Sequence, residues 1–159
     1  METYHVGLIG LAFFAVLAFI AFFGWRRRIS RQQMTIPKPA ELGTLTKGFN
    51  CHYVATTYAD RPLDRVVAYG LAHRGQASIS VSTSGVEVAR TGEFSFLIPR
   101  SDLIQVGSSA AVIDRAVEKD GLVSIRWRLG SQELESHFRF VDARLRLGIL
   151  TDLAEIVSA

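Results

Sequence analysis

The sequence of 159 residues contains one cysteine, Cys51. A lone cysteine cannot form a disulfide within the chain, and it cannot supply the paired thiolates of a structural zinc site. This usage agrees with a reducing compartment. We therefore predict that Cys51 is a small buried strand residue and not a nucleophile.

The sequence also lacks the motifs that usually carry catalysis or nucleotide binding. It contains no G-x-x-x-x-G-K-[ST], no G-x-G-x-x-G and no G-x-S-x-G. No two of His5, His52, His73 and His137 have the spacing of a helical zinc site. Cys51 and His52 are adjacent in a predicted strand, so their side chains point to opposite faces and cannot form a dyad. The prediction is a protein that is not an enzyme and has no metal or cofactor.

Charged residues are absent from residues 6–25, which read VGLIGLAFFAVLAFIAFFGW. Twenty helical residues are about 30 Å long, the thickness of the hydrocarbon core of a bilayer. The Val, Leu, Ile and Phe residues together favour the membrane by roughly 4 to 7 kcal/mol. A cleaved signal peptide would need a basic start and a small-residue cleavage site, which METYH and GWRRR do not provide. We predict one transmembrane anchor within residues 1–28, with Trp25 at the membrane interface.

Four arginines follow the span directly: Arg26, Arg27, Arg28 and Arg31. Residues 26–47 carry a formal charge of +5, while residues 1–25 and 48–159 each carry −1, which sums to +3. The positive-inside bias predicts an outside N-terminus and a cytoplasmic C-terminal domain at the plasma (inner) membrane. Attraction to anionic headgroups, about 1 kcal/mol per side chain, is the simpler reading of the cluster, and a specific lipid site is the alternative. Because the domain itself is nearly neutral, nucleic-acid binding is not expected.

Pro37, Pro39 and Gly43 interrupt residues 29–47, and a Pro-Lys-Pro stretch cannot lie inside a helix or a central strand. We predict a semi-extended tether over residues 29–47 and a folded domain over residues 48–159.

From Gly48 the hydrophobic pattern has period two, which predicts strands. A turn at Ser84-Gly85 would place Val81 opposite Val88. A short helix is expected somewhere in residues 63–71. The predicted strands before the last hairpin are residues 49–57, 76–83, 86–90, 94–99 and 103–109, with 111–115 extending the last one.

The clearest predicted hairpin covers residues 122–141, in which apolar and polar residues alternate in both arms. A turn at Ser131-Gln132 would pair Leu129 with Leu134, and Arg128 with Glu135. A helix is predicted for residues 142–157, with Asp142 as its N-cap. Its apolar stripe consists of Leu145, Ile149, Leu153 and Ile156.

Six or seven antiparallel strands followed by one amphipathic helix make an α+β, mostly β domain. The 122–141 hairpin running straight into the last helix resembles a pleckstrin-homology (PH) domain. With the N-terminal span and arginines, the chain resembles small membrane-anchored PH-like proteins of actinobacteria. The resemblance implies a partly open antiparallel β-barrel capped by the C-terminal helix. PH domains that bind phosphoinositides carry a basic motif around the first strand–strand loop, whereas Arg61, Arg65 and Arg74 here alternate with Asp60 and Asp64.

Three functions fit this organisation. The first is a scaffold or binding module that recruits a protein partner to the inner membrane face. The second is a single-span accessory subunit of a transport or export complex. The third is an anionic-lipid sensor that uses the Arg26–Arg31 cluster and the outer face of the last hairpin. That outer face, a candidate partner or headgroup face, comprises Arg126, Arg128, His137 and Arg139. Besides the lipid bilayer and a protein partner, self-association through Ala12, Ala15, Ala18 and Ala21 stays open.

Overall fold

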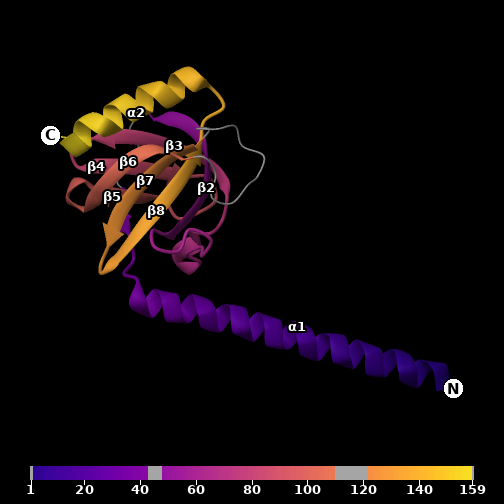
Figure 1. Ribbon diagram of the computed structural model, residues 1–159. Helices are drawn as coiled ribbons and strands as arrows, with labels where there is room; N and C mark the ends of the chain where they lie inside the picture. The colour runs from indigo at the N-terminus through magenta and orange to yellow at the C-terminus, as the bar shows by residue number, and fades with distance from the viewer. Residues whose placement is uncertain (1, 43–47, 110–121, 159) are drawn as a thin grey trace.

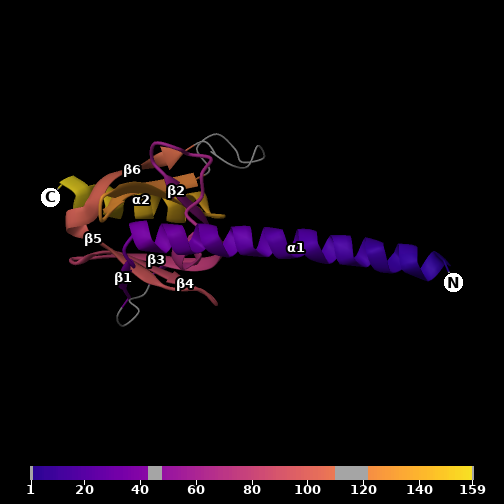
Figure 2. The ribbon, with the colours of Figure 1, turned by 90° about the horizontal axis from the view of Figure 1, so that it is seen from below.

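The computed structural model describes residues 2–42, 48–109 and 122–158. One long helix, α1 (Glu2–Thr35), projects from a small β-domain that carries a second helix, α2 (Ala143–Ser158). Figures 1 and 2 show that only the last part of α1 lies against the domain. The described part of the chain therefore consists of an apolar rod and one folded domain joined at the end of that rod.

Helix α1 is long and apolar enough to cross a membrane over Gly7–Thr35, and none of its apolar window is buried by the protein. The prediction of a tether that begins at residue 29 is wrong for residues 29–35, which are helical. Residues 26–35 contain no proline or glycine to break a helix. The residue before a proline disfavours helical backbone, so the helix ends just before Ile36 and Pro37. About ten helical residues thus continue beyond the predicted span.

The strands form one open antiparallel sheet in the order β1-β5-β4-β3-β2-β8-β7-β6. Strand β2 pairs with β3 at its start and with β8 at its end, with a bulge between Tyr53 and Ala55. A bulge bends a strand, so β2 can serve both halves of the curved sheet. The strands are β1 (Ala40–Glu41), β2 (Phe49–Tyr58), β3 (Gly75–Ser82), β4 (Gly85–Arg90), β5 (Phe96–Pro99), β6 (Leu103–Ser109), β7 (Leu122–Leu129) and β8 (Gln132–Arg139).

The inner face of the curved sheet holds the core. Phe96 and Trp127 stack with ring centroids 5.8 Å apart, and Tyr53 meets Phe138 edge-on at 5.6 Å. All four side chains are fully buried. This architecture of seven longer strands, the two-residue β1 and a C-terminal helix confirms the mostly β, PH-like fold class.

The predicted registers of both hairpins are wrong by two residues. Leu129 pairs with Gln132 across a Gly130-Ser131 turn, and Val81 pairs with Val86 across Thr83-Ser84. Gly130 has a φ of 61°, which favours a tight two-residue turn at that position. A shift of two residues leaves every side chain on its predicted face, so the core assignment is unaffected.

Helix α2 packs across the curved sheet and contacts β6 and β3. Asp142 is its N-cap, because the backbone N–H of Arg144 donates to Asp142 Oδ1 at 2.8 Å. Ile149 and Leu153 are fully buried, whereas Leu145 at the start of the stripe is partly exposed. The expected helix in 63–71 is only a 3-10 turn at Ala68–Gly70. The predicted extension at 111–115 lies outside the described residues.

Candidate functional site

The end of α1 is docked on the domain, and an ion pair marks the start of the contact. Arg28 donates from one guanidinium nitrogen to Asp64 Oδ1 at 2.6 Å and to the carbonyl oxygen of Arg65 at 3.4 Å. Asp64 also accepts from Arg61 at 3.2 Å. One carboxylate of the β2–β3 connection therefore receives two guanidinium groups, one of them from α1.

One turn further along α1, Gln32 provides the central contact. Its side-chain oxygen accepts hydrogen bonds from the backbone N–H groups of Val67 at 2.7 Å and Ala68 at 3.2 Å. Val67 is the N-cap of the 3-10 turn and Ala68 is its first residue, and both are buried. Because buried backbone donors need acceptors, Gln32 completes the fold of this connection as well as holding the helix to it.

At the end of the helix the chain enters the core. Ile36 is fully buried, and its carbonyl oxygen accepts from the hydroxyl of Tyr69 at 3.1 Å. Pro37 then packs beside Gly130, where a side chain would come within 3.0 Å of the proline ring. Ala40 follows and pairs with Leu97 in the sheet. The contacts with the domain thus begin at Arg28 and continue to Glu41, which pairs with Phe96 in the sheet.

Only one arginine of the predicted cluster takes part in this docking. Arg28 contacts the domain although its side chain is 49% exposed, whereas Arg26, Arg27 and Arg31 are exposed on the rest of the helix surface. The guanidinium of Arg26 lies over the ring of Phe22, 5.7 Å from its centroid. Trp25 is exposed, as are the other large apolar residues of the segment, so its interfacial position stays a prediction.

Only some of the four residues predicted to form an exposed face on the last hairpin are exposed. Arg128 and Arg139 are exposed, and the arginines of β7 pair across the hairpin: Arg126 with Glu135 at 3.6 Å, and Arg128 with Glu133 at 3.8 Å. The interpretation of His137 as an exposed member of this face is wrong.

His137 is only 2% exposed, and Thr57 next to it on β2 is 1% exposed. The Nε2 of His137 lies 3.4 Å from the hydroxyl of Thr57, and among the described residues its buried Nδ1 has no hydrogen-bond partner. Burial lowers the pKa of His137, and the nearby Glu135 carboxylate offsets part of that effect.

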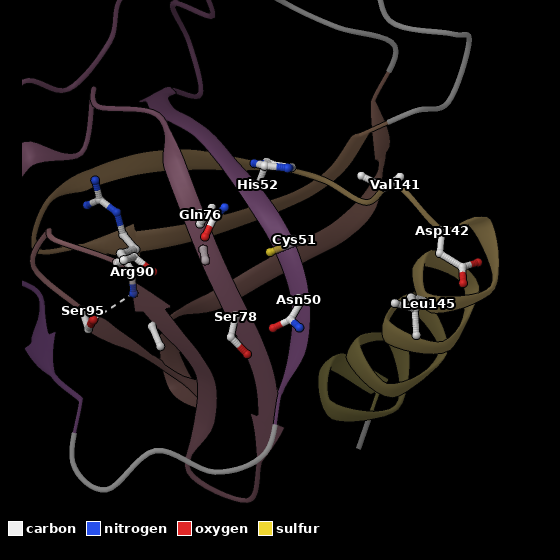
Figure 3. Close-up of a pocket in the computed structure, with 13 residues that line it drawn as sticks. Asn50, Cys51, His52, Gln76, Ser78, Arg90, Ser95, Val141, Asp142 and Leu145 are labelled. Atoms are coloured by element: carbon white, nitrogen blue, oxygen red, sulfur yellow. Dashed lines mark hydrogen bonds between the residues drawn. The ribbon is translucent and has the colours of Figure 1, made fainter.

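A groove that we did not predict lies beside the start of α2, where Val141 and Leu145 form part of its lining (Figure 3). Asn50, His52, Gln76 and Ser78 line its floor on the outer face of β2 and β3, and its volume is about 720 Å³. The pairing of His52 with Arg139 places the exposed arginine of β8 at the side of this floor. The sequence signal was the polar half of the period-two pattern, which marks any solvated strand face and so cannot by itself indicate a site.

Arg90 also lines the groove, but its charge is held inside the domain. Its guanidinium donates to the carbonyl oxygens of Gly70 at 2.8 Å and His73 at 3.1 Å. It also lies over the ring of Tyr53, 4.3 Å from the centroid. Arg90 therefore fixes the β2–β3 connection to β4 and does not present a free cation to a ligand.

A family model described as Bacterial PH domain-like matches residues 32–153. The chain belongs to this bacterial PH domain-like family. The match begins inside α1, at the glutamine that accepts the two backbone hydrogen bonds, so the docked end of the helix is included in the family domain. None of the curated proteins matches the chain.

PH-like domains are generally non-catalytic binding modules. Across residues 2–42, 48–109 and 122–158, no three His, Cys, Asp or Glu side chains group in a way that could hold a metal ion. The two features that stand out are therefore the docked junction and the groove beside α2 with Arg139 next to it.

Proposed function

We propose that this protein is a membrane-anchored PH-like binding module that holds its domain at the inner face of the plasma membrane and recruits a protein partner there. The observation that carries the proposal is the docked junction between α1 and the domain. A flexible tether would let the domain rotate freely, whereas a docked helix presents the same surface at all times. Binding by a pre-oriented surface avoids part of the entropy cost of association.

The candidate partner face comprises Arg139, His52 and Gln76, which lie side by side on β8, β2 and β3. All three side chains are exposed. The groove next to them combines polar side chains of β2 and β3 with apolar ones at the start of α2, such as Val141 and Leu145, a mixture that suits a peptide segment. With an arginine at its side, this face fits a partner segment with acidic and polar residues.

Proximity labelling from the C-terminus in the native cell tests this proposal. The full chain is compared with Arg139→Glu and with the matched control Arg100→Glu, which reverses an exposed arginine at the start of the 3-10 turn Arg100–Asp102. We expect one set of neighbours to be lost with Arg139→Glu and kept with Arg100→Glu. A fragment of residues 1–42 with the same label reports the neighbours of the anchor alone. If the full chain and both variants label only those neighbours, the domain recruits no partner.

The exposure of Arg26, Arg27 and Arg31 supports a second candidate, an anionic-lipid sensor. Hydrogen exchange of the full chain in nanodiscs separates the two functions. A lipid sensor predicts slower exchange in the domain when phosphatidylglycerol replaces part of the phosphatidylcholine. A module for a protein partner predicts the same exchange in both bilayers.

A further inference from the structure

We propose that the tip loop, residues 59–65, lies in the headgroup layer of the same bilayer that α1 spans, with Leu63 inserted among the lipids. The occupant of this surface is the bilayer itself, contacted beside the anchor. The inference depends on α1 as the membrane span and on its docking, and it does not depend on the recruitment of a partner.

The order of contacts along the junction sets the direction of the loop. Arg28 contacts Asp64 and Arg65, and Gln32 contacts Val67 and Ala68. The last contact joins Ile36 to Tyr69. Each step of four helical residues moves about 6 Å along the helix axis. Arg28 is the contact residue nearest the membrane, and its partner Asp64 belongs to the tip loop, whereas Ile36 is the farthest and contacts Tyr69. The tip loop therefore lies at the end of the connection that is closest to the bilayer.

The depth of the loop follows from helix geometry. Trp25 ends the apolar segment, and Arg28 is three residues, or about 4.5 Å, further along the axis. A bilayer with a core of about 30 Å and a total thickness of about 40–45 Å has an interfacial layer of about 5–8 Å on each side. Arg28 and its partner Asp64 therefore lie within this layer, with Leu63 next in the chain.

The chemistry of the loop suits this layer. Leu63, in the turn of the tip loop, is 82% exposed within the protein, so its side chain is free to enter a lipid layer. The acidic side chains nearby are neutralised: Arg61 pairs with Asp60 at 3.4 Å and with Asp64 at 3.2 Å, and Arg28 adds a second partner for Asp64. A loop with an apolar tip and compensated carboxylates can enter anionic headgroups without a repelling charge.

Fluorescence quenching of the full chain in phosphatidylcholine–phosphatidylglycerol vesicles tests the inference. An environment-sensitive probe is attached at Leu63→Cys or, as the matched control, at Ser131→Cys. Ser131 follows Gly130, which packs against Pro37, at least about 15 Å beyond the apolar segment along the axis. Burial raises the pKa of the native Cys51 thiol to about 12, so the label reacts with the introduced thiol.

We expect lipids with a shallow nitroxide to quench the probe at position 63 several-fold more than the probe at 131, and aqueous iodide to do the reverse. Equal quenching at the two positions would overturn the inference. A third probe, at Phe19→Cys, reports on the anchor itself. If it is quenched by lipid and the probe at 63 is not, only this inference fails; if it is not quenched, the membrane anchor of the proposed function fails too.

The double variant Arg28→Ala, Gln32→Ala separates the docked geometry from an intrinsic affinity of the loop for lipid. Undocking should expose the probe at position 63 to iodide, while the probe at Phe19→Cys stays in the lipid. If the probe at 63 stays in the lipid after undocking, the docked helix does not place the loop, and the inference is wrong.

Discussion

At the scale of single residues, one chain of hydrogen bonds crosses the core in a fixed direction. The ring nitrogen of Trp127 can only donate, and it donates to Ser136 Oγ at 3.0 Å. At the other end, the Tyr53 hydroxyl donates its one proton to the carbonyl oxygen of Leu71 at 2.8 Å. Thr56 must therefore donate to Tyr53 at 2.6 Å, and Ser136 must donate to Thr56 at 2.7 Å. The chain joins β7, β8 and β2 to the β2–β3 connection.

The first prediction concerns Ser136→Ala. The change leaves the buried Trp127 N–H without its acceptor and Thr56 without its donor. We expect a loss of about 1–3 kcal/mol of the free energy of unfolding, since an unsatisfied buried donor has a cost of this size. Urea unfolding of the full chain in mild detergent, followed by tryptophan fluorescence, measures it. Ser131→Ala, in the exposed turn, serves as the control and should change little.

The second prediction concerns the pH dependence of stability through His137. Burial lowers the pKa of His137 in the folded protein, so the unfolded chain binds a proton more readily. Stability should therefore be lost as the pH falls through about 6.5, the ordinary histidine value, towards the lowered pKa of the folded state. Melting temperatures of the full chain between pH 8 and 5 measure this loss. His137→Gln should flatten the profile and His52→Gln, at an exposed position, should not; equal flattening would contradict the assignment.

At the scale of secondary-structure elements, hydrophobic alternation predicted the strands but not their pairing. The period of two identifies which side chains face the core, and β6 (Leu103–Ser109) has the predicted bounds. The register depends on where each turn falls, and several polar or glycine residues adjoin both turns. The observed turns lie at Gly130 and next to Gly85, two positions where only glycine fits the backbone. Gly130 has a positive φ, and a side chain at Gly85 would collide with the carbonyl oxygen of Ile98. The contact that requires glycine at position 85 is made by the neighbouring strand β5, and a single sequence does not show which strands are neighbours.

The docked end of α1 was harder to predict than any strand. Arg28 and Gln32 are one turn apart on the helix, but such spacing is common on solvated helices. Pro37 and Pro39 explain why the helix ends at Thr35. They do not indicate that Ile36 is buried in the core. The contact is made to Asp64, Val67 and Ala68, more than 30 residues away, where no local pattern could indicate a partner.

The third prediction concerns Gln32→Ala at this junction. Without the side-chain acceptor, the backbone N–H groups of Val67 and Ala68 lose their partner, and the connection should open more often. We expect amide exchange in residues 60–72 to accelerate by about ten- to a hundredfold, the equivalent of about 1–3 kcal/mol. Hydrogen-exchange mass spectrometry of the full chain measures it. The neighbouring exposed residue supplies the control, Gln33→Ala, and equal acceleration in both variants would mean that Gln32 does not hold the connection.

At the scale of the whole molecule, one cluster of arginines at the end of the apolar segment supplies both the positive charge next to the membrane and a contact with the docked domain. Residues 26–47 carry +5 in the sequence; the charge of Arg28 is paired with Asp64, and Arg26, Arg27 and Arg31 are further exposed cations beside the predicted membrane surface. These three side chains can contribute to the orientation of the chain without altering the junction. The determinants of topology and of docking can therefore be changed separately.

The fourth prediction is that these arginines place the domain in the cytoplasm. In intact cells, a membrane-impermeant maleimide should label His5→Cys and should not label Ser131→Cys until the membrane is opened. Replacing Arg26, Arg27 and Arg31 with Gln removes most of the positive-inside bias, so labelling at Ser131→Cys in intact cells should rise. Arg28→Gln alone is the matched control, since it removes one charge and the ion pair with Asp64 and leaves the three exposed cations. If Ser131→Cys is labelled in intact cells with all four arginines present, the domain lies outside, and recruitment at the inner face is wrong.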